Sequence, residues 1–112
     1  MHLGDNDAHA IEEGEPSIMA GYRSLTTRLE GSPNRRRRAE LEEIRTISYE
    51  EVLRDKVVVG GPERVVDRLK QLEEELGIDG ILVELNFGSA IPAETMMRSL
   101  QLLCDKVMPH FK

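Results

Sequence analysis

The side chains that could do chemistry in this sequence lie in two short segments, each at the end of an apolar run. The first segment is Gly60 and Gly61, which follow three valines and precede a proline. Glycines before a helix let the backbone approach a phosphate, and helix N-termini attract anions. Pro62 offers no amide proton there, and Glu63 adds a negative charge. A purely structural strand-to-helix turn is therefore the favoured interpretation of this segment.

The second segment runs from Glu84 to Gly88. Strand alternation would place Glu84 and Asn86 on one face, and a carboxylate buried there could act as a general base. A salt-bridged structural glutamate is the more common arrangement. Asn86 could hydrogen-bond to a ligand and Phe87 could stack against it, with a simple loop role as the alternative. We expect Glu84, Asn86, Phe87 and Gly88 to line a substrate pocket.

Other chemical motifs have little support. His2, His9 and His110 lie far apart and lack any metal-ligand spacing, such as two histidines one helical turn apart. The sequence also has no serine elbow and no Walker-type phosphate loop. We therefore assign no catalytic residue and no metal site.

Composition excludes several classes of protein. The chain has 112 residues, a formal net charge of −6 and a single cysteine. No apolar run approaches the roughly 18 residues of a membrane span, and no secretory signal is present, so we expect a cytoplasmic protein without a membrane segment. The acidic balance argues against nucleic-acid binding. Cys104 lies within an apolar helical stripe, which predicts a buried thiol.

The first half of the chain is predicted to be helical. Residues 1–16 carry five acidic and no lysine or arginine side chains, which suggests a flexible lead-in. A helical segment over residues 17–54 follows. Its predicted parts are a helix over 17–30, a turn over 31–34, a solvated helix start at the arginines 35–38 and a short helix over 49–54 behind the capping box of Ser48 and Glu51.

The second half, residues 55–112, reads as strand, helix, strand, helix. The three valines at 57–59 predict a strand, and a helix follows from Pro62 to Leu76 with Gly77 as its stop. Residues 81–86 predict a second strand. The last helix is expected from about Pro92 to Met108, with an apolar stripe formed by Met96, Leu100, Leu103 and Val107.

Both predicted strands are apolar on both faces. Such strands belong to parallel sheets that are covered by helices or closed into barrels. Two strands alone leave open edges, which are templates for aggregation. The chain therefore needs more strands than it encodes. Further strands could come from a longer protein, from a separate partner chain or from a homo-oligomer.

Several strings in this half together resemble the C-terminal end of luciferase-like, flavin-dependent monooxygenases. The resemblance covers roughly residues 46–112. It implies an α/β fold, namely the C-terminal βαβα portion of a (β/α)8 TIM-type barrel preceded by a helical segment. The strings are Ser48-Tyr49-Glu50-Glu51-Val52-Leu53, Val57-Val58-Val59-Gly60-Gly61-Pro62-Glu63-Arg64-Val65, Leu76-Gly77-Ile78-Asp79-Gly80, Asn86-Phe87-Gly88 and Val107-Met108-Pro109-His110-Phe111.

The resemblance also implies a function. It suggests a reduced-flavin enzyme acting on a small organic substrate, with FMN or a deazaflavin as cofactor and Gly60 and Gly61 near the flavin phosphate. Gly61 stands where the family usually has serine or threonine, and the family's first six strands are absent. Activity is therefore expected only within a complete barrel. The alternative is a non-catalytic interaction or oligomerisation module.

Overall fold

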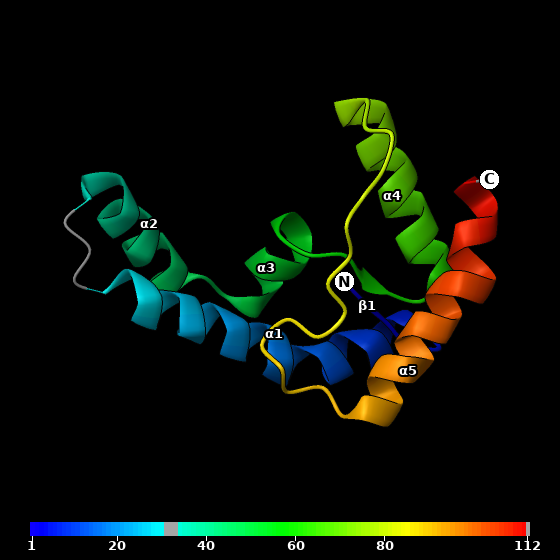
Figure 1. The fold of residues 1–112 in the computed structure, drawn as a ribbon, viewed down its shortest axis with the longest axis horizontal. Helices are drawn as coiled ribbons and strands as arrows, with labels where there is room; N and C mark the ends of the chain where they lie inside the picture. Colours follow the sequence, from blue (N-terminus) through cyan, green and yellow to red (C-terminus); the bar gives the residue numbers. More distant parts are fainter. Residues whose placement is uncertain (31–33, 112) are drawn as a thin grey trace.

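The computed structural model describes residues 1–30 and 34–111 of the chain, so most of the turn predicted at 31–34 lies outside the described residues. The described part is mostly helical, with one small parallel sheet (Figure 1). Its elements in chain order are β1 His2–Leu3, α1 Asp7–Leu29, α2 Arg35–Thr46, α3 Tyr49–Asp55, β2 Val59–Gly60, α4 Pro62–Leu76, α5 Ala93–Leu102, the π-helical turn η1 Leu103–Val107 and the 3₁₀ turn η2 Met108–Phe111.

The sheet joins the start of the chain to its middle. His2 lies opposite Val59 and Leu3 lies opposite Gly60 in a parallel pair. The amide of His2 donates to the carbonyl of Val58 at 3.0 Å, and the amide of Gly4 donates to that of Gly60 at 3.2 Å. Parallel strands need a long crossover connection, and here helices α1, α2 and α3 provide it.

The prediction of a flexible lead-in over residues 1–16 is wrong, because these residues form β1 and the first turns of α1. Asn6 caps this helix, because its side chain accepts a hydrogen bond from the amide of His9 at 2.9 Å. The helix predicted over residues 17–30 therefore begins ten residues earlier, at Asp7, and Pro16 lies inside it. The small residues Ala10 and Gly14 are buried, so packing of α1 against the rest of the chain offsets the hydrogen bond that proline removes.

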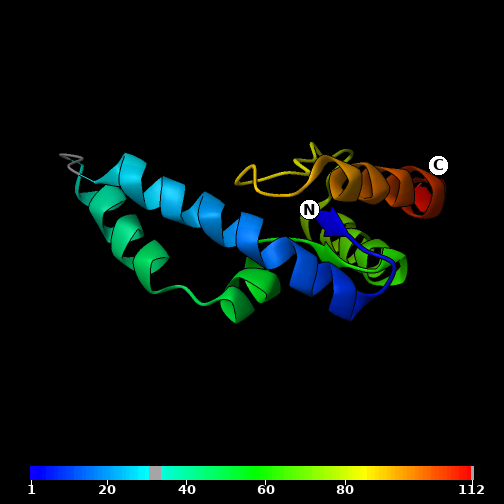
Figure 2. The same cartoon turned by 90° about the horizontal axis from the view of Figure 1, so that it is seen from below.

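Two hydrophobic clusters hold the fold together. One lies between β1, α4 and the last helical turns, and it includes Leu3, Val65 and Val107. The other lies between α1, α3 and β2, and it includes Ile18 and Val52. Figure 2 shows the loop after residue 80 and α5 on one side of α1, with α2 and α3 on the other. Helix α1 thus lies between α2 and α3 on one side and the loop before α5 on the other.

Three helix predictions are confirmed. Helix α4 has the predicted bounds, and Gly77 ends it in the left-handed conformation with a φ of 63°. The serine half of the capping box is present, since Ser48 Oγ accepts from the amide of Glu51 at 3.2 Å. The arginine run begins α2 as expected, and Arg36 lies 3.6 Å from Glu40 in an exposed ion pair.

The second predicted strand is not present. Residues 81–86 are irregular, and none of them is buried. Leu82 is completely exposed and Ile81 is half exposed. A strand is stabilised by ladder hydrogen bonds from a neighbour. Among the described residues no strand pairs with this segment, although the ammonium group of Met1, which precedes β1, donates to the carbonyl of Glu84. The expected βαβα unit therefore reduces to a mostly helical α/β arrangement with two short strands.

The last helix faces the core differently from the prediction. Ser99 and Leu102 are its buried positions, while Leu100 is exposed. Ser99 Oγ accepts from the amide of Leu3 at 2.9 Å, which fixes α5 against β1. In the π-helical turn after Leu102, the predicted stripe residues Leu103 and Val107 do face the core. Cys104 of the same turn is exposed, and its predicted burial is wrong.

None of the helices in the described ranges combines the length and the apolar character that crossing a membrane would require.

Candidate functional site

The residues predicted to do chemistry are separated in the structure. Gly60 and Gly61 lie where β2 ends and α4 begins. Asn86, Phe87 and Gly88 lie in a loop that packs against the middle of α1. The two glycines thus contact the start of α1 at Asp7, whereas Phe87 and Gly88 contact its middle at Ser17 and Gly21.

At the first location, Asp7 occupies the start of α4. Its Oδ1 accepts a hydrogen bond from the amide of Gly61 at 2.7 Å. A Cβ atom on Gly60 would lie 2.8 Å from the side chain of Arg64 and 3.0 Å from Asp7, so only glycine fits there without a shift. The carboxylate of Asp7 thus stands where an external anion would bind to the helix N-terminus.

These residues do not fit a flavin phosphate in this arrangement. The amide of Gly61 already donates its hydrogen bond to Asp7, and Pro62 has no amide proton to donate to a phosphate. Glu63 adds a negative charge in the first turn of α4, which would repel one. The structural strand-to-helix turn, the interpretation that the sequence favoured, describes this geometry.

Removing the Asp7 carboxylate should destabilise the junction of the two strands with α4. We expect Asp7→Ala to lower the free energy of unfolding by about 1–2 kcal/mol, because it removes a charged acceptor from a helix N-terminus and leaves a partly buried amide unpaired. The urea midpoint of unfolding measures the effect. Glu63→Gln is the matched control, since Glu63 is an exposed acid in the same turn. Equal destabilisation by both variants would contradict the role of Asp7.

At the second location, Asn86 closes a short loop. Its Oδ1 accepts from the amide of Ile91 at 3.0 Å, and its Nδ2 donates to the carbonyl of Ile91 at 3.4 Å. Both ends of the side-chain amide are therefore used within the chain. Asn86 shapes the loop over residues 86–91 instead of presenting a free amide to a ligand.

Ser17 ties this loop to α1. Its hydroxyl is fully buried, donates to the carbonyl of Phe87 at 2.6 Å and accepts from the amide of Ala90 at 3.1 Å. This role could not be predicted, because a serine inside a helix is ordinary and its partners lie some seventy residues away.

Phe87 and Gly88 complete the anchor. The ring of Phe87 packs edge-on against Tyr22 with the ring centroids 5.6 Å apart and an interplanar angle of 79°. It also lies directly over Gly21, where a Cβ atom would overlap the ring. Gly88 has a φ of 89°, and a Cβ atom on it would overlap the carbonyl oxygen of Ser17. The predicted pocket residues thus fasten a loop in this structure.

Glu84 is exposed and is not the buried carboxylate that general-base chemistry would need. Its backbone carbonyl accepts a hydrogen bond from the ammonium group of Met1 at 3.0 Å. Burial lowers the pKa of that ammonium group, and the nearby charge of Glu84 partly opposes the change.

His2 is a buried titratable group that sequence reasoning had only considered as a metal ligand. Its Nε2 lies 3.4 Å from Glu13 Oε1. Its Nδ1 is buried without a hydrogen-bond partner among the described residues. Burial lowers the pKa of His2, although Glu13 opposes this by raising it. Within the described ranges, no group of three histidine, cysteine or acidic side chains is arranged to hold a metal ion.

The lowered pKa of His2 predicts weaker folding in mild acid. The folded state holds the neutral ring, so its stabilising contribution is present above the unfolded pKa of about 6.5 and is lost as the pH falls through and below that value. Urea midpoints measured between pH 8 and pH 5 should decline, and His2→Gln should reduce the decline. A variant with the same pH dependence as the original chain would show that His2 does not cause it.

Comparisons of the chain with protein-family models, with curated protein sequences and with solved structures found no match.

Proposed function

We propose that this chain is the C-terminal part of a reduced-flavin-dependent, luciferase-like monooxygenase that acts on a small organic substrate, and that it works only within a completed barrel. The observation that carries the proposal is the exposure of the apolar residues in the segment 81–86. This run has the apolar composition of a doubly covered strand, yet Leu82 is completely exposed. Neighbouring strands from outside the chain would pair with it and cover it.

The order of elements supports the same proposal. Strand β1 is followed by α1, and β2, parallel to it, is followed by α4. The segment 81–86 is followed in turn by α5. Repeated β-then-α units with parallel strands are the building blocks of (β/α)8 barrels.

The accessible surface area and the radius of gyration of the chain support the proposal that its core is incomplete. Its accessible area is 7610 Å², whereas a folded monomer of 12.7 kDa is expected to expose about 6,200 Å². Its radius of gyration is 15.1 Å, against about 13 Å for a compact domain of roughly 100 residues. Both values describe a chain that exposes more surface than a self-sufficient domain would.

In this proposal the flavin, FMN or a deazaflavin, is held mainly by preceding barrel strands. The residues of this chain do not themselves fit it, because Asp7 uses the amide of Gly61 and the loop over 86–91 is engaged with α1. Pairing of residues 81–86 with further strands would have to release that loop. Phe87 and Glu84 already line a hollow beside Tyr22 in this structure, whereas Asn86 and Gly88 do not. After release of the loop, Asn86 and Gly88 would join them in a substrate pocket at the carboxyl end of a barrel strand.

Flavin titration tests the proposal. The chain alone should not bind FMN at micromolar concentrations. The longer polypeptide, encoded by an open reading frame that continues upstream of Met1 through further βα units, should bind FMN and consume oxygen in the presence of reduced flavin. An upstream sequence that encodes no βα units, or a longer polypeptide without flavin-dependent oxygen consumption, would refute the proposal.

A second candidate function is a non-catalytic association module. The exposed apolar side chains of Met97 and Leu100 on the outer face of α5 favour it, since such residues can bury surface against a partner. This candidate predicts a stable oligomer that neither binds FMN nor changes when the upstream polypeptide is added. The barrel proposal predicts instead that adding the upstream polypeptide dissociates the oligomer and restores FMN binding.

A further inference from the structure

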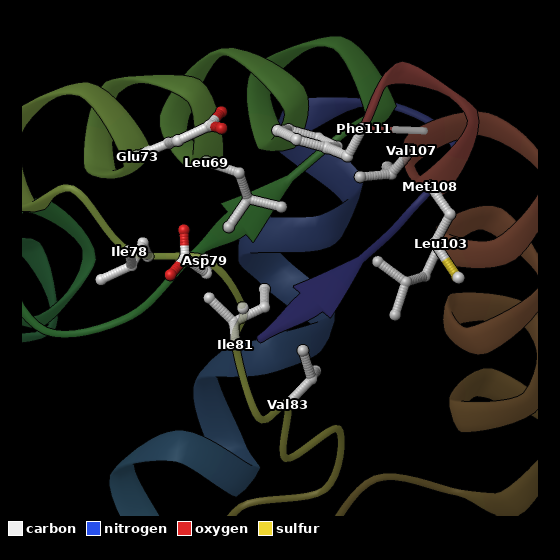
Figure 3. Close-up of a pocket in the computed structure, with 11 residues that line it drawn as sticks. Leu69, Glu73, Ile78, Asp79, Ile81, Val83, Leu103, Val107, Met108 and Phe111 are labelled. Carbon is white, nitrogen blue, oxygen red and sulfur yellow. The ribbon is translucent and has the colours of Figure 1, made fainter.

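A pocket of about 360 Å³ opens between α4, the chain after Gly77 and the C-terminal helical turns (Figure 3). Its walls include the side chains of Leu69, Ile81, Leu103, Val107 and Phe111. A volume of this size lies at the lower end of the range for small-molecule sites. The pocket shares no lining residue with the Gly61 junction or the loop over residues 86–91.

The walls of the pocket are apolar and partly exposed to solvent. Leu69 and Val107 are buried at its base, whereas Ile81 is 50% and Phe111 is 41% exposed. Covering these side chains would remove apolar surface from water, which is favourable. A ligand for this pocket therefore needs an apolar body.

The charged side chains of the pocket are both acidic. Glu73 and Asp79 line it, and no lysine, arginine or histidine does. In Figure 3 the two carboxylates lie on one side of the pocket, with Leu103 and Met108 on the other. Within the described part of the chain, neither carboxylate takes part in an ion pair. The side facing the apolar wall is thus left with two uncompensated negative charges.

The end of α4 adds to this negative potential. Residues 73–75 are all glutamates, and the last turn of α4 contains no basic residue. A helix C-terminus carries a partial negative charge, which favours cations and disfavours carboxylates. A positive group placed between Glu73 and Asp79 would be stabilised by both side chains and by the helix.

From this combination we infer that the pocket binds a small organic cation with an apolar body, of the class of primary alkylammonium or arylmethylammonium ions. The apolar body lies against Leu69, Val107 and Phe111, and the ammonium group lies beside Glu73 and Asp79. An uncharged ligand of the same shape lacks the second interaction, and an anionic one is repelled. This inference concerns the chain by itself, because Ile81 and Val83 of the pocket belong to the segment 81–86 that the proposed barrel would pair with further strands.

Three six-carbon probes separate these effects: hexylammonium, hexanol and hexanoate. Each is titrated into the isolated chain at pH 7 and followed by the amide resonances in a nitrogen–proton correlation spectrum. Hexylammonium should give saturable shifts concentrated at Gly80, Val107 and Phe111. Its affinity should exceed that of hexanol by about 5-fold, as expected for partly exposed ion pairs, and hexanoate should not saturate. Equal affinity for hexanol, dispersed shifts or no binding of any probe would overturn the inference.

Charge-removing variants test the position of the ammonium group. Asp79→Asn and Glu73→Gln should each weaken hexylammonium binding by about 2-fold and leave hexanol binding unchanged. Glu74→Gln is the matched control, because Glu74 lies in the same helical turn and does not line the pocket. All three residues are exposed, so the urea midpoint should not change. An equal loss in the control would show that net charge, and not this pocket, causes the preference.

Discussion

Replacement of Gly88 by alanine should destabilise the fold by about 3 kcal/mol or more. Gly88 has a φ of 89°, a conformation that alanine adopts only at a cost. The added Cβ atom would also overlap the carbonyl oxygen of Ser17, which is buried backbone of α1 and cannot move aside. The loop would have to leave α1, which breaks the hydrogen bonds of Ser17. The urea midpoint and the near-ultraviolet signal of Tyr22 measure the change.

Two other glycines separate the causes of this effect. Gly77 also has a positive φ, of 63°, but a Cβ atom there meets nothing within 4 Å, so Gly77→Ala should cost only about 1 kcal/mol of conformational strain. Gly80 has neither the strain nor the contact, and Gly80→Ala should change stability by less than about 0.5 kcal/mol. If Gly88→Ala costs no more than Gly77→Ala, the loop is not packed on α1 as described.

The second large effect is expected at Leu3. This residue is 1% exposed and packs with Val65 and Val107 in the first cluster. Leu3→Ala should lower the free energy of unfolding by about 2–5 kcal/mol, because it leaves a cavity beside β1. The result bears directly on the start of the chain, since a flexible lead-in would tolerate the substitution. Denaturant unfolding followed by circular dichroism measures it.

Leu76→Ala is the matched control for Leu3. It removes the same atoms from a leucine that is 65% exposed at the end of α4. The change in stability should stay within about 0.5 kcal/mol. Similar losses for the two variants would mean that the N-terminal residues are not part of the core.

The sequence predicted those elements whose signals are local. Helix α4 has a proline at its start and a left-handed glycine at its end, and both act through the neighbouring backbone alone. The start of α1 was missed because Pro16 was interpreted as a signal just before a helix that begins at Ser17, whereas the actual cap is Asn6. The strand at 81–86 was predicted from composition, but a strand also needs a partner, and composition does not say where one lies.

The candidate site was predictable in part. Asn86, Phe87 and Gly88 were singled out as a polar, an aromatic and a flexible residue together in a loop, and the structure does give each of them a specific contact. Their partner Ser17 could not be found from the sequence, because the contact spans about seventy residues and has no motif. The sequence also could not show that Asp7 would reach the amide of Gly61.

We propose that the apolar run at 81–86 pairs with strands that this chain does not supply. Sedimentation velocity of the purified chain, without flavin or a second polypeptide, tests this proposal. We expect concentration-dependent self-association that Leu82→Lys shifts towards monomer, because a lysine on an exposed strand edge opposes pairing. A monodisperse monomer that unfolds cooperatively under the same conditions would contradict it.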